Sequence, residues 1–303
     1  MNSFVYSNCY FGSHISFKGT LTDTLQLALE NRMYSIQFFL GNRLRLNRTT
    51  LSEEDICSAN KILNIWDIHT FTHIPYSVNF AGKGGILSSS GNEEVSSYVD
   101  TCVQSVQHEL STLDKLNASK KGCVIHIGSI GSHPDRKKGL DCVVQSINKL
   151  VIPESTPLCL ETMVGRGGVL GTTMEELKYI MDRTTHPKGR IKLCIDTCHL
   201  YAEGLYDLGK EIEIDRCFHD IESLFGDMSV LQCIHFNDSE CEFKSKQDRH
   251  ARIGQGYIFK AQGKPMNQSV HYLLQMCERY KIPTILETTS EDYDNVLQNI
   301  TYF

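Results

Sequence analysis

Short, mainly apolar runs recur along the chain, and the segments between them bring apolar residues back every three or four positions. Runs of the first kind predict β-strands, and segments of the second kind predict helices. Eight strands are expected, at residues 10–16, 35–40, 68–75, 122–129, 158–163, 192–199, 231–238 and 284–289. Helical spacing is clearest at residues 92–116 and 266–280. Strands that alternate with helices imply parallel βαβ units.

Eight such units in 303 residues favour a closed (β/α)8 barrel over an open sheet. A chain of this length could also form two ordinary domains, but no obvious linker divides it. We therefore expect one barrel domain over residues 1–303. In a barrel of this kind the active site lies at the C-terminal face of the strands.

Composition and charge narrow the class of protein. Hydrophobic residues make up 41% of the chain and charged residues 22%, which is ordinary for a folded soluble protein. No apolar run approaches the roughly 20 residues needed to span a bilayer, and the first residues lack the pattern of a secretory signal. An intracellular protein is expected, with cytoplasm and nucleus not distinguished. The net charge of −6 argues against general affinity for polyanions, although it allows a local basic site or one made positive by metal ions.

Twelve cysteines are scattered along the chain, several within apolar runs, which is typical of reduced, buried thiols. The stretch CIDTCHLYAEG, which begins at Cys194, could hold a cysteine metal site, a redox pair, or an aspartate and a histidine that bind metal while the cysteines pack. Asp196 and His199 are an odd number of residues apart, so a continuous strand would point them to opposite faces. We expect the strand to end near Thr197, with a turn that brings His199 over the barrel mouth. Cys194 and Cys198 are then expected only to pack.

Side chains that can bind metal stand at the ends of successive predicted strands. They are His73, His126, Glu161, Asp196, His199, His235 and Glu287, and the pair Asp248 and His250 follows the seventh strand. The carboxyl ends of barrel strands meet on one face. One divalent ion uses about four to six ligands, so these nine residues predict more than one ion, with bridging carboxylates. Histidine with carboxylate suits zinc or manganese.

Each of these residues also has an interpretation that requires no metal. His126 could be a core histidine that hydrogen-bonds to the backbone. Glu161 and Glu287 could be carboxylates placed near helix N-termini, and Asp196 could cap the segment that follows it. Their recurrence at equivalent places in successive units favours a shared metal site.

Four motifs in this chain resemble those of the endonuclease IV type of apurinic/apyrimidinic (AP) endonucleases. They are LETMVGRGGVLG, CIDTCHLYAEG, IHFNDSE with DRHARIGQG, and PTILET, and the resemblance extends over residues 12–290. It implies a xylose-isomerase-like barrel and hydrolysis of the phosphodiester 5′ to an abasic site, giving a 3′-hydroxyl and a 5′-deoxyribose phosphate. Removal of 3′-blocking groups is also expected. The implied partner is damaged or 3′-blocked double-stranded DNA, and the implied oligomeric state is a monomer.

The resemblance also implies three zinc ions, with Mn²⁺ possible at one site. His73, His126 and Glu161 would hold the first, Glu161, Asp196, His235 and Glu287 the second, and His199, Asp248 and His250 the third. A hydroxide between the first two ions would be the nucleophile, and Glu287 would orient it or accept its proton. His14, in GSHIS, matches a family histidine near the site and could support the ligands or only the barrel.

Recognition of a missing base requires the duplex to be bent and the gap to be filled by side chains. Tyr76 matches the tyrosine that the family inserts, whereas Ser77 departs from the usual bulky neighbour. Arg43, Arg45 and Arg48 lie in the loop after the second strand, where the family inserts an arginine. The register is uncertain by one residue, so both Arg43 and Arg45 are candidates. A solvated loop with no DNA contact is the alternative.

Two other functions are compatible with a barrel of this kind. A sugar isomerase or epimerase would need one or two metal ions and a catalytic lysine or glutamate pair, and it would have no reason to keep the third site formed by His199 with the Asp248 and His250 pair. A barrel that binds damaged DNA or metal without cutting is disfavoured by the intact acidic residues Glu161, Asp196 and Glu287.

Overall fold

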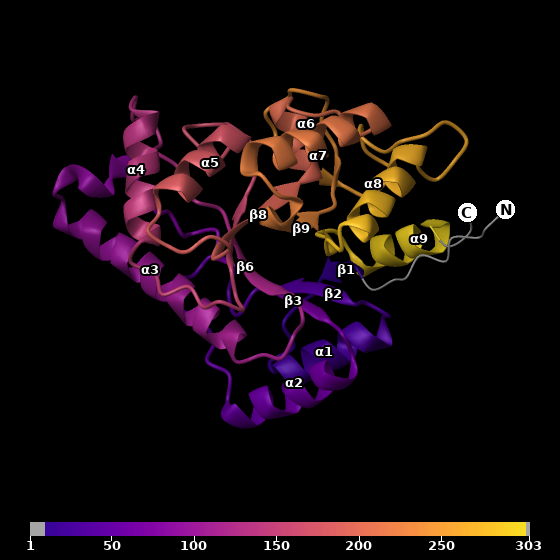
Figure 1. Cartoon of the computed structure of the whole chain (residues 1–303), viewed down its shortest axis with the longest axis horizontal. Coiled ribbons are helices and arrows are strands. Elements are labelled where there is room, and N and C mark those ends of the chain that lie inside the picture. The colour runs from indigo at the N-terminus through magenta and orange to yellow at the C-terminus, as the bar shows by residue number, and fades with distance from the viewer. Residues whose placement is uncertain (1–9, 301–303) are drawn as a thin grey trace.

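The computed structural model describes residues 10–300, and in it eight parallel strands close into a barrel surrounded by helices (Figure 1). The barrel strands are β1 (Phe11–His14), β2 (Ser35–Phe38), β3 (His69–His73), β6 (Lys121–Ile125), β7 (Leu158–Glu161), β8 (Ile191–Asp196), β9 (Leu231–His235) and β12 (Thr284–Leu286). Around the barrel their order is β1, β12, β9, β8, β7, β6, β3, β2. The predicted fold class is therefore confirmed, and each strand is shorter than the apolar run that predicted it.

Nine α-helices are present in the described residues, and at least one of them follows each barrel strand, as the βα pattern requires. The helices are α1 (Leu21–Glu30), α2 (Glu53–Ile65), α3 (Glu93–Asp114), α4 (Arg136–Ile147), α5 (Met174–Arg183), α6 (Thr197–Glu203), α7 (Glu211–Phe225), α8 (Gln268–Arg279) and α9 (Ser290–Ile300). Several begin at a polar residue whose side chain accepts a hydrogen bond from the backbone N–H three residues on. Thr20, Ser52, Asn92, Asp135 and Thr173 do so.

Two small antiparallel pairs extend the loops above the barrel. One joins β4 (Gly82–Lys83) to β5 (Ile86–Leu87), and the other joins β10 (Asp238–Ser239) to β11 (His250–Ala251). Short 3₁₀ turns lie at Ser88–Ser90 and Met228–Val230. The second pair matters for the site, because Ser239 lies opposite His250 and the loop between β10 and β11 therefore returns to the residues that follow β9.

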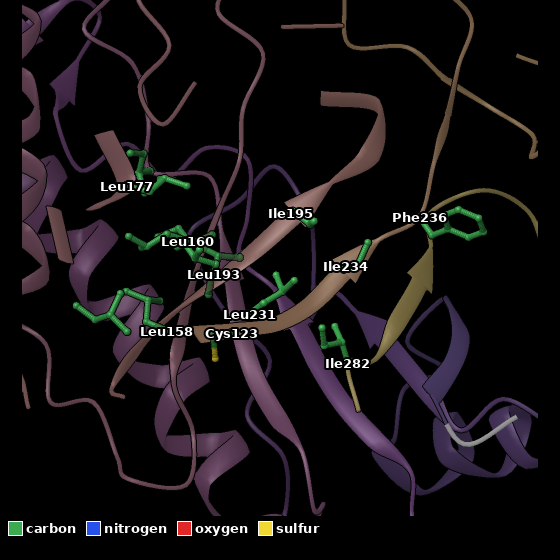
Figure 2. Packing of buried hydrophobic residues seen from close by; sticks show 14 of the residues in the cluster. Cys123, Leu158, Leu160, Leu177, Leu193, Ile195, Leu231, Ile234, Phe236 and Ile282 are labelled. Atoms are coloured by element: carbon green, nitrogen blue, oxygen red, sulfur yellow. The ribbon is translucent and has the colours of Figure 1, made fainter. Parts of the chain in front are cut away.

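The strands divide their side chains between two packed regions. Leu160, Leu193 and Leu231, on three neighbouring strands, belong to the larger core cluster between barrel and helices (Figure 2). A separate layer inside the barrel contains Phe71, Val124, Cys159, Cys194, Cys233 and Ile285. Side chains two residues apart on a strand face the same side. Glu161, Asp196 and His235, each two residues after a cysteine of this layer, therefore also face the barrel interior, nearer its carboxyl end.

The cysteines of residues 10–300 are free thiols, and nine of them are buried. Burial raises the pKa of Cys194 to about 12, so its thiol keeps its proton at neutral pH. A thiolate is the form that binds metal. Cys194 therefore packs inside the barrel together with Cys159 and Cys233, as the sequence predicts for Cys194. Cys9, which the sequence analysis counted with the others, lies outside the described residues.

Candidate metal centre

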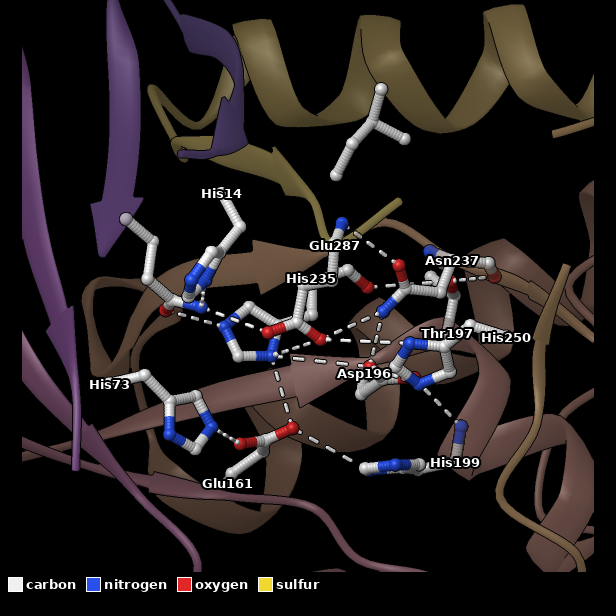
Figure 3. A network of polar contacts seen from close by, with 12 residues as sticks. His14, His73, Glu161, Asp196, Thr197, His199, His235, Asn237, His250 and Glu287 are labelled. Atoms are coloured by element: carbon white, nitrogen blue, oxygen red, sulfur yellow. Dashed lines mark hydrogen bonds and ion pairs between the residues drawn. The ribbon is translucent and has the colours of Figure 1, made fainter. Parts of the chain in front are cut away.

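The first group of possible ligands comes from the ends of three adjacent strands. His73 ends β3, His126 follows β6 and Glu161 ends β7. The Nε2 atoms of His73 and His126 lie 3.2 and 3.0 Å from Oε2 of Glu161. Figure 3 shows the contact between His73 and this carboxylate. Nδ1 of His73 is 2.7 Å from the carbonyl oxygen of Ile74, which can only accept a hydrogen bond, so Nδ1 donates. Nε2 of His73 is thereby left facing the other two side chains with a lone pair.

A second group uses the other oxygen of the same glutamate. Oε1 of Glu161 lies 3.0 Å from Nδ1 of His235, and Oε2 of Glu287 lies 3.4 Å from that nitrogen. Asp196 completes the group with Oδ2 at 4.0 Å from the same atom. One ligand atom from each of the four residues lies within 4.8 Å of the others. Glu161 therefore faces one group with each carboxylate oxygen, which is the geometry of a bridging ligand.

The third group depends on the turn at the end of β8. Asp196 caps α6, and its Oδ1 accepts a hydrogen bond of 2.8 Å from the backbone N–H of His199. Nε2 of His199 lies 3.1 Å from Oδ2 of Asp248, and Nε2 of His250 lies 3.1 Å from Oδ1 of the same carboxylate. Asp248 keeps 48% of its side chain exposed, so this group lies at the mouth of the barrel. All nine residues predicted from the sequence as ligands are thus close together.

Cys198 lies close enough to Asp248 and His250 to form another possible donor group. Its thiol, however, is buried and donates to the carbonyl oxygen of Arg249 at 3.6 Å. Burial and the nearby carboxylate of Asp196 raise the pKa of Cys198 well above its ordinary value. These contacts agree with the expectation that Cys198 packs.

Charge and burial oppose one another throughout this centre. Burial disfavours an ionised Glu161, but the imidazoles of His126 and His235 hold its pKa well below the ordinary value. Burial also disfavours a charged His235, but the carboxylates of Glu287 and Glu161 raise the pKa of that imidazole well above its ordinary value. Asp196 differs, because burial raises its pKa despite the neighbouring histidines.

Two buried nitrogens supply an independent test of whether metal would fit. Nε2 of His199 and Nε2 of His250 are buried and have no hydrogen-bond partner of acceptable geometry. Buried polar atoms are rarely left in this way without an ion or a water beside them. Both nitrogens face the carboxylate of Asp248. Imidazole nitrogens and carboxylate oxygens in this arrangement fit a divalent ion such as zinc.

Gln37, at the third position of β2, is a supporting residue that the sequence analysis missed. It is buried, its Nε2 donates to Oε1 of Glu287 at 2.9 Å, and its Oε1 accepts from Nε2 of His235 at 2.8 Å. His14, on β1, lies 3.2 Å from the same amide nitrogen, and burial lowers the pKa of His14 to about 4. A glutamine inside the apolar run SIQFFL was the signal that could have revealed it.

Asn237 is a second supporting residue that was missed. Its Nδ2 donates to Oδ2 of Asp196 at 2.6 Å and to Oε2 of Glu287 at 3.1 Å, and its Oδ1 accepts from the backbone N–H of Glu287. Thr162 supports the same region, because its Oγ1 accepts from the backbone N–H of Asp196 and its carbonyl accepts from Nδ1 of His199. The ligands are therefore held in position by a network of neutral side chains.

The residues expected to contact DNA lie beside the first ligand group. Tyr76 is 45% exposed, and its ring stacks on that of His126 with 5.2 Å between centroids. Its backbone N–H donates to the carbonyl of Arg43 at 2.9 Å, which joins the loops after β2 and β3. Arg43 and Arg45 are exposed. Arg48 is buried and lies 2.7 Å from Oε1 of Glu109, so it supports the loop and does not reach solvent.

Sequence comparisons with known proteins show the family of this chain. The family model described as xylose isomerase-like TIM barrel, of AP endonuclease family 2, matches residues 25–272. An apurinic-apyrimidinic endonuclease of Caenorhabditis elegans is 30% identical over 295 residues, covering 95% of this chain and 68% of that protein. The chain belongs to the endonuclease IV family of AP endonucleases. A probable endonuclease 4 of Pediococcus pentosaceus is 28% identical, covering 91% of this chain and 86% of that protein.

Solved structures of the same fold include endonuclease IV itself. Endonuclease IV from Thermus thermophilus superposes with a TM-score of 0.75 at 19% identity, covering 95% of this chain and 97% of that one. A D-tagatose 3-epimerase-like protein superposes with a TM-score of 0.64 at 16% identity, covering 97% of each chain. At such identities these likenesses concern the fold alone. The predicted family and the class of hydrolase are confirmed. Within residues 10–300, no helix has the length and apolar character of a membrane span.

Proposed function

We propose that this endonuclease IV family member hydrolyses the phosphodiester on the 5′ side of abasic sites in double-stranded DNA. The products would be a 3′-hydroxyl and a 5′-deoxyribose phosphate, and the same site would remove 3′-blocking groups. The observation that carries the proposal is the clustering of nine donor residues at the barrel mouth, where Glu161 belongs to two groups and His199 and His250 both face Asp248. Family membership supports the substrate.

The proposed cofactors are three zinc ions, with Mn²⁺ possible at one site. The ligands would be His73, His126 and Glu161 for the first, Glu161, Asp196, His235 and Glu287 for the second, and His199, Asp248 and His250 for the third. Bound zinc would polarise the phosphate and lower the pKa of water towards about 7. A positive cluster of this kind would also offset the net charge of −6 where DNA binds.

The protein's own contribution is to fix the carboxylates and imidazoles before substrate arrives. Glu287 accepts hydrogen bonds from Gln37 on one oxygen and from Asn237 on the other. Burial raises its pKa, but His235 and other imidazoles bring it down to about 2. With both oxygens held in this way, Glu287 would orient the nucleophile or accept its proton.

Tyr76 and the arginine loop would recognise the lesion. The backbone hydrogen bond between Tyr76 and Arg43 joins the loop that carries the exposed Tyr76 ring, which stacks on His126, to the loop that carries the exposed Arg43 and Arg45. Arg43 and Arg45 are the proposed contacts to the bent duplex, and Arg48 is not among them. We also propose that residues 1–303 act as one catalytic domain, as an intracellular monomer.

Sugar epimerisation is the alternative on this fold. The third donor group argues against it, because an epimerase would have no use for His199, Asp248 and His250 around a further metal ion. Nε2 of each histidine is buried and faces the carboxylate of Asp248 at 3.1 Å without a hydrogen bond of acceptable geometry, an arrangement that an ion between these side chains would satisfy. The endonuclease proposal gives this group a role and the epimerase proposal does not.

The deciding experiment uses an end-labelled duplex that contains one tetrahydrofuran abasic analogue. We expect the purified protein to cut on the 5′ side of the analogue, leaving a 3′ end that a DNA polymerase extends, and a chelator to abolish cutting. An intact duplex of the same sequence is the control. Failure to cut the abasic duplex in the presence of zinc would reject the proposal. Metal analysis should find more than two zinc ions per chain, and one or none would reject the trinuclear centre.

A further inference from the structure

Two of the proposed ligands of the third ion follow a stretch of unusual backbone in the loop between β10 and β11. Lys244 and Lys246 adopt φ angles of 66° and 58°, in the left-handed region that few residues other than glycine enter. Within residues 10–300 the other non-glycine residues in that region are Arg32 and Lys281. Each of these lies just beyond the end of a helix, where this conformation is common. Lys244 and Lys246 follow a strand instead, so the surrounding structure must hold them in place.

The loop keeps this conformation because it packs on the end of α6. The backbone N–H of Lys244 donates to the carbonyl oxygen of Tyr201 at 3.3 Å, and that of Lys246 donates to the carbonyl oxygen of Ala202 at 2.9 Å. The helix ends just before Gly204, and a Cβ atom at this glycine would lie 2.0 Å from Cγ of Lys244. Glycine therefore allows the loop and the helix end to approach closely.

An ion pair joins the loop to the helix at the same place. Nζ of Lys246 donates to the carboxylate of Glu203, and it also donates to the carbonyl oxygen of that residue at 3.0 Å. The carboxylate side chain is only 10% exposed, whereas that of Lys246 is 42% exposed. Oε2 of Glu203 accepts a hydrogen bond of 2.7 Å from the backbone N–H of Gly165, in the loop after β7. This pair, Glu203 with Lys246, is called the latch below, and it connects α6 to two loops of the barrel mouth.

The segments that the latch joins carry the whole third donor group. His199 lies in the first turn of α6, and Asp248 and His250 lie at the end of the loop. His250 belongs to β11, where pairing with Ser239 already fixes its backbone. Asp248 precedes β11 and is 48% exposed, and the ion pairs of its carboxylate within the described residues are with His199 and His250. The position of Asp248 therefore depends on the loop that the latch holds.

We propose that Glu203 and Lys246 are positioning residues for the third metal ion. The latch keeps the loop in the conformation in which Asp248 and His250 face His199, so the ion binds without first having to order the loop. When only a fraction of the molecules has the site formed, the apparent affinity falls by that fraction. The first two donor groups have no member on this loop, so their affinity does not depend on the latch. The inference rests on the proposed trinuclear centre and assigns a role to residues that bind neither metal nor substrate.

The test measures the zinc that the loaded protein retains after dialysis against a series of chelator concentrations. Lys246→Met keeps the length of the side chain but removes the ammonium, and it should release one zinc ion at an about tenfold lower chelator concentration than the wild type, the loss expected for one charged hydrogen bond. Lys246→Arg restores the pair and should return the release curve to that of the wild type. Lys178→Met is the matched control, because Lys178 is also partly exposed and pairs with Asp182 on its own helix, α5. It should release zinc as the wild type does.

A second variant removes the other half of the latch. Glu203→Gln keeps an acceptor for the backbone N–H of Gly165 but loses the charge, and it should release one zinc ion as early as Lys246→Met does. A third variant shows which ion is affected. His199→Ala removes a ligand of the third ion, so Lys246→Met should change nothing further in a chain that already carries His199→Ala.

The outcomes separate the latch from the function on which it rests. If the wild type binds three zinc ions and cleaves the abasic duplex, but the Lys246→Met and Glu203→Gln variants retain zinc as the wild type does, the latch proposal is wrong and the function stands. An effect of Lys246→Met that persists in the His199→Ala chain would also overturn the latch, because the ion affected would not be the third. If the wild type binds three zinc ions but does not cut abasic DNA, the proposed function fails, and the release curves still decide the role of the latch. Fewer than three ions on the wild type would overturn both.

Discussion

Replacement of Gln37 by methionine tests whether neutral side chains set the metal affinity of the centre. Methionine has nearly the same length and volume but cannot make the hydrogen bonds of the amide to Glu287 and His235 or its contact with His14. Gln37 donates to Glu287 at 2.9 Å and accepts from His235 at 2.8 Å, and both partners are proposed ligands of the second metal ion. The variant therefore releases two ligands of one ion and leaves the other ions untouched.

The size of the effect follows from these two contacts. A hydrogen bond to a ligand from the surrounding shell is worth about 10- to 100-fold in metal affinity. Two such bonds serve the same ion here, so we expect a loss towards the upper end, about 100-fold or about 3 kcal/mol. Stability should fall as well, by about 1 to 3 kcal/mol, because Nε2 of His235 would be buried without a partner.

Zinc occupancy is measured by elemental analysis after dialysis against a series of chelator concentrations. The Gln37→Met variant should lose one zinc ion per chain at a chelator concentration that leaves the wild type loaded. Gln232→Met is the matched control, since Gln232 lies at the other end of β9 and donates only to the carbonyl of Lys121. Identical zinc release from the wild type and the Gln37 variant would refute the reasoning. Equal release from both variants would mean that the effect is general destabilisation.

Three further predictions concern single residues. Glu161→Gln should reduce cleavage of the abasic duplex by at least about 10³-fold, because removal of a bridging charge weakens two metal sites at once. Circular dichroism should show an unchanged fold. Near-normal cleavage by this variant would reject the bridging role of Glu161. Cys194→Ala should leave the zinc content unchanged, and a loss of zinc would return that cysteine to the list of ligands. His69→Gln should reduce the loss of stability at acid pH. Burial lowers the pKa of His69 to about 4, so between about pH 4 and 6.5 the unfolded wild-type chain binds more protons than the folded one. The free energy of unfolding of the wild type therefore falls as the pH falls, by at most about 3 kcal/mol. Urea unfolding of the variant at pH 7 and pH 5 tests this, and a slope equal to that of the wild type would contradict it.

The strands and the convergence of the candidate ligands on them could be predicted from the sequence because both depend on local pattern. An apolar run marks a barrel strand, and a histidine or carboxylate at its end must lie at the mouth once the barrel closes. His73, Glu161 and His235 are the last residues of their strands, where the sequence placed them. Closure of the barrel brings these strand ends together. The number of strands was therefore enough to predict that the three side chains lie close to one another.

The supporting residues could not be predicted in this way, because their roles depend on distances between strands. Gln37 and Asn237 carry amides, which are not among the usual protein ligands of zinc. A glutamine inside the apolar run SIQFFL is a local sign, but it does not reveal which residues the amide contacts. Their partners are 198 to 250 residues away for Gln37 and 41 to 50 away for Asn237. The same limit applied to the arginine loop. The contact of Arg48 with Glu109, on α3, and its hydrogen bonds to the carbonyls of Asn42 and Arg45 separate this buried side chain from the exposed Arg43 and Arg45.

The stretch CIDTCHLYAEG shows how one local rule can replace another. The separation of three between Asp196 and His199 conflicts with the period of a strand, but it is the separation between a helix cap and the backbone N–H that the cap accepts. The structure uses it in this way, since β8 ends at Asp196 and α6 begins at Thr197. Oδ1 of Asp196 holds the first turn of the helix, and Oδ2 faces His250 at 3.6 Å and His235 at 4.0 Å. A single carboxylate thus fixes the position of His199 in the third donor group and belongs itself to the second. Loss of this side chain should therefore disturb both groups together, which neither the loss of His199 nor that of His235 would do.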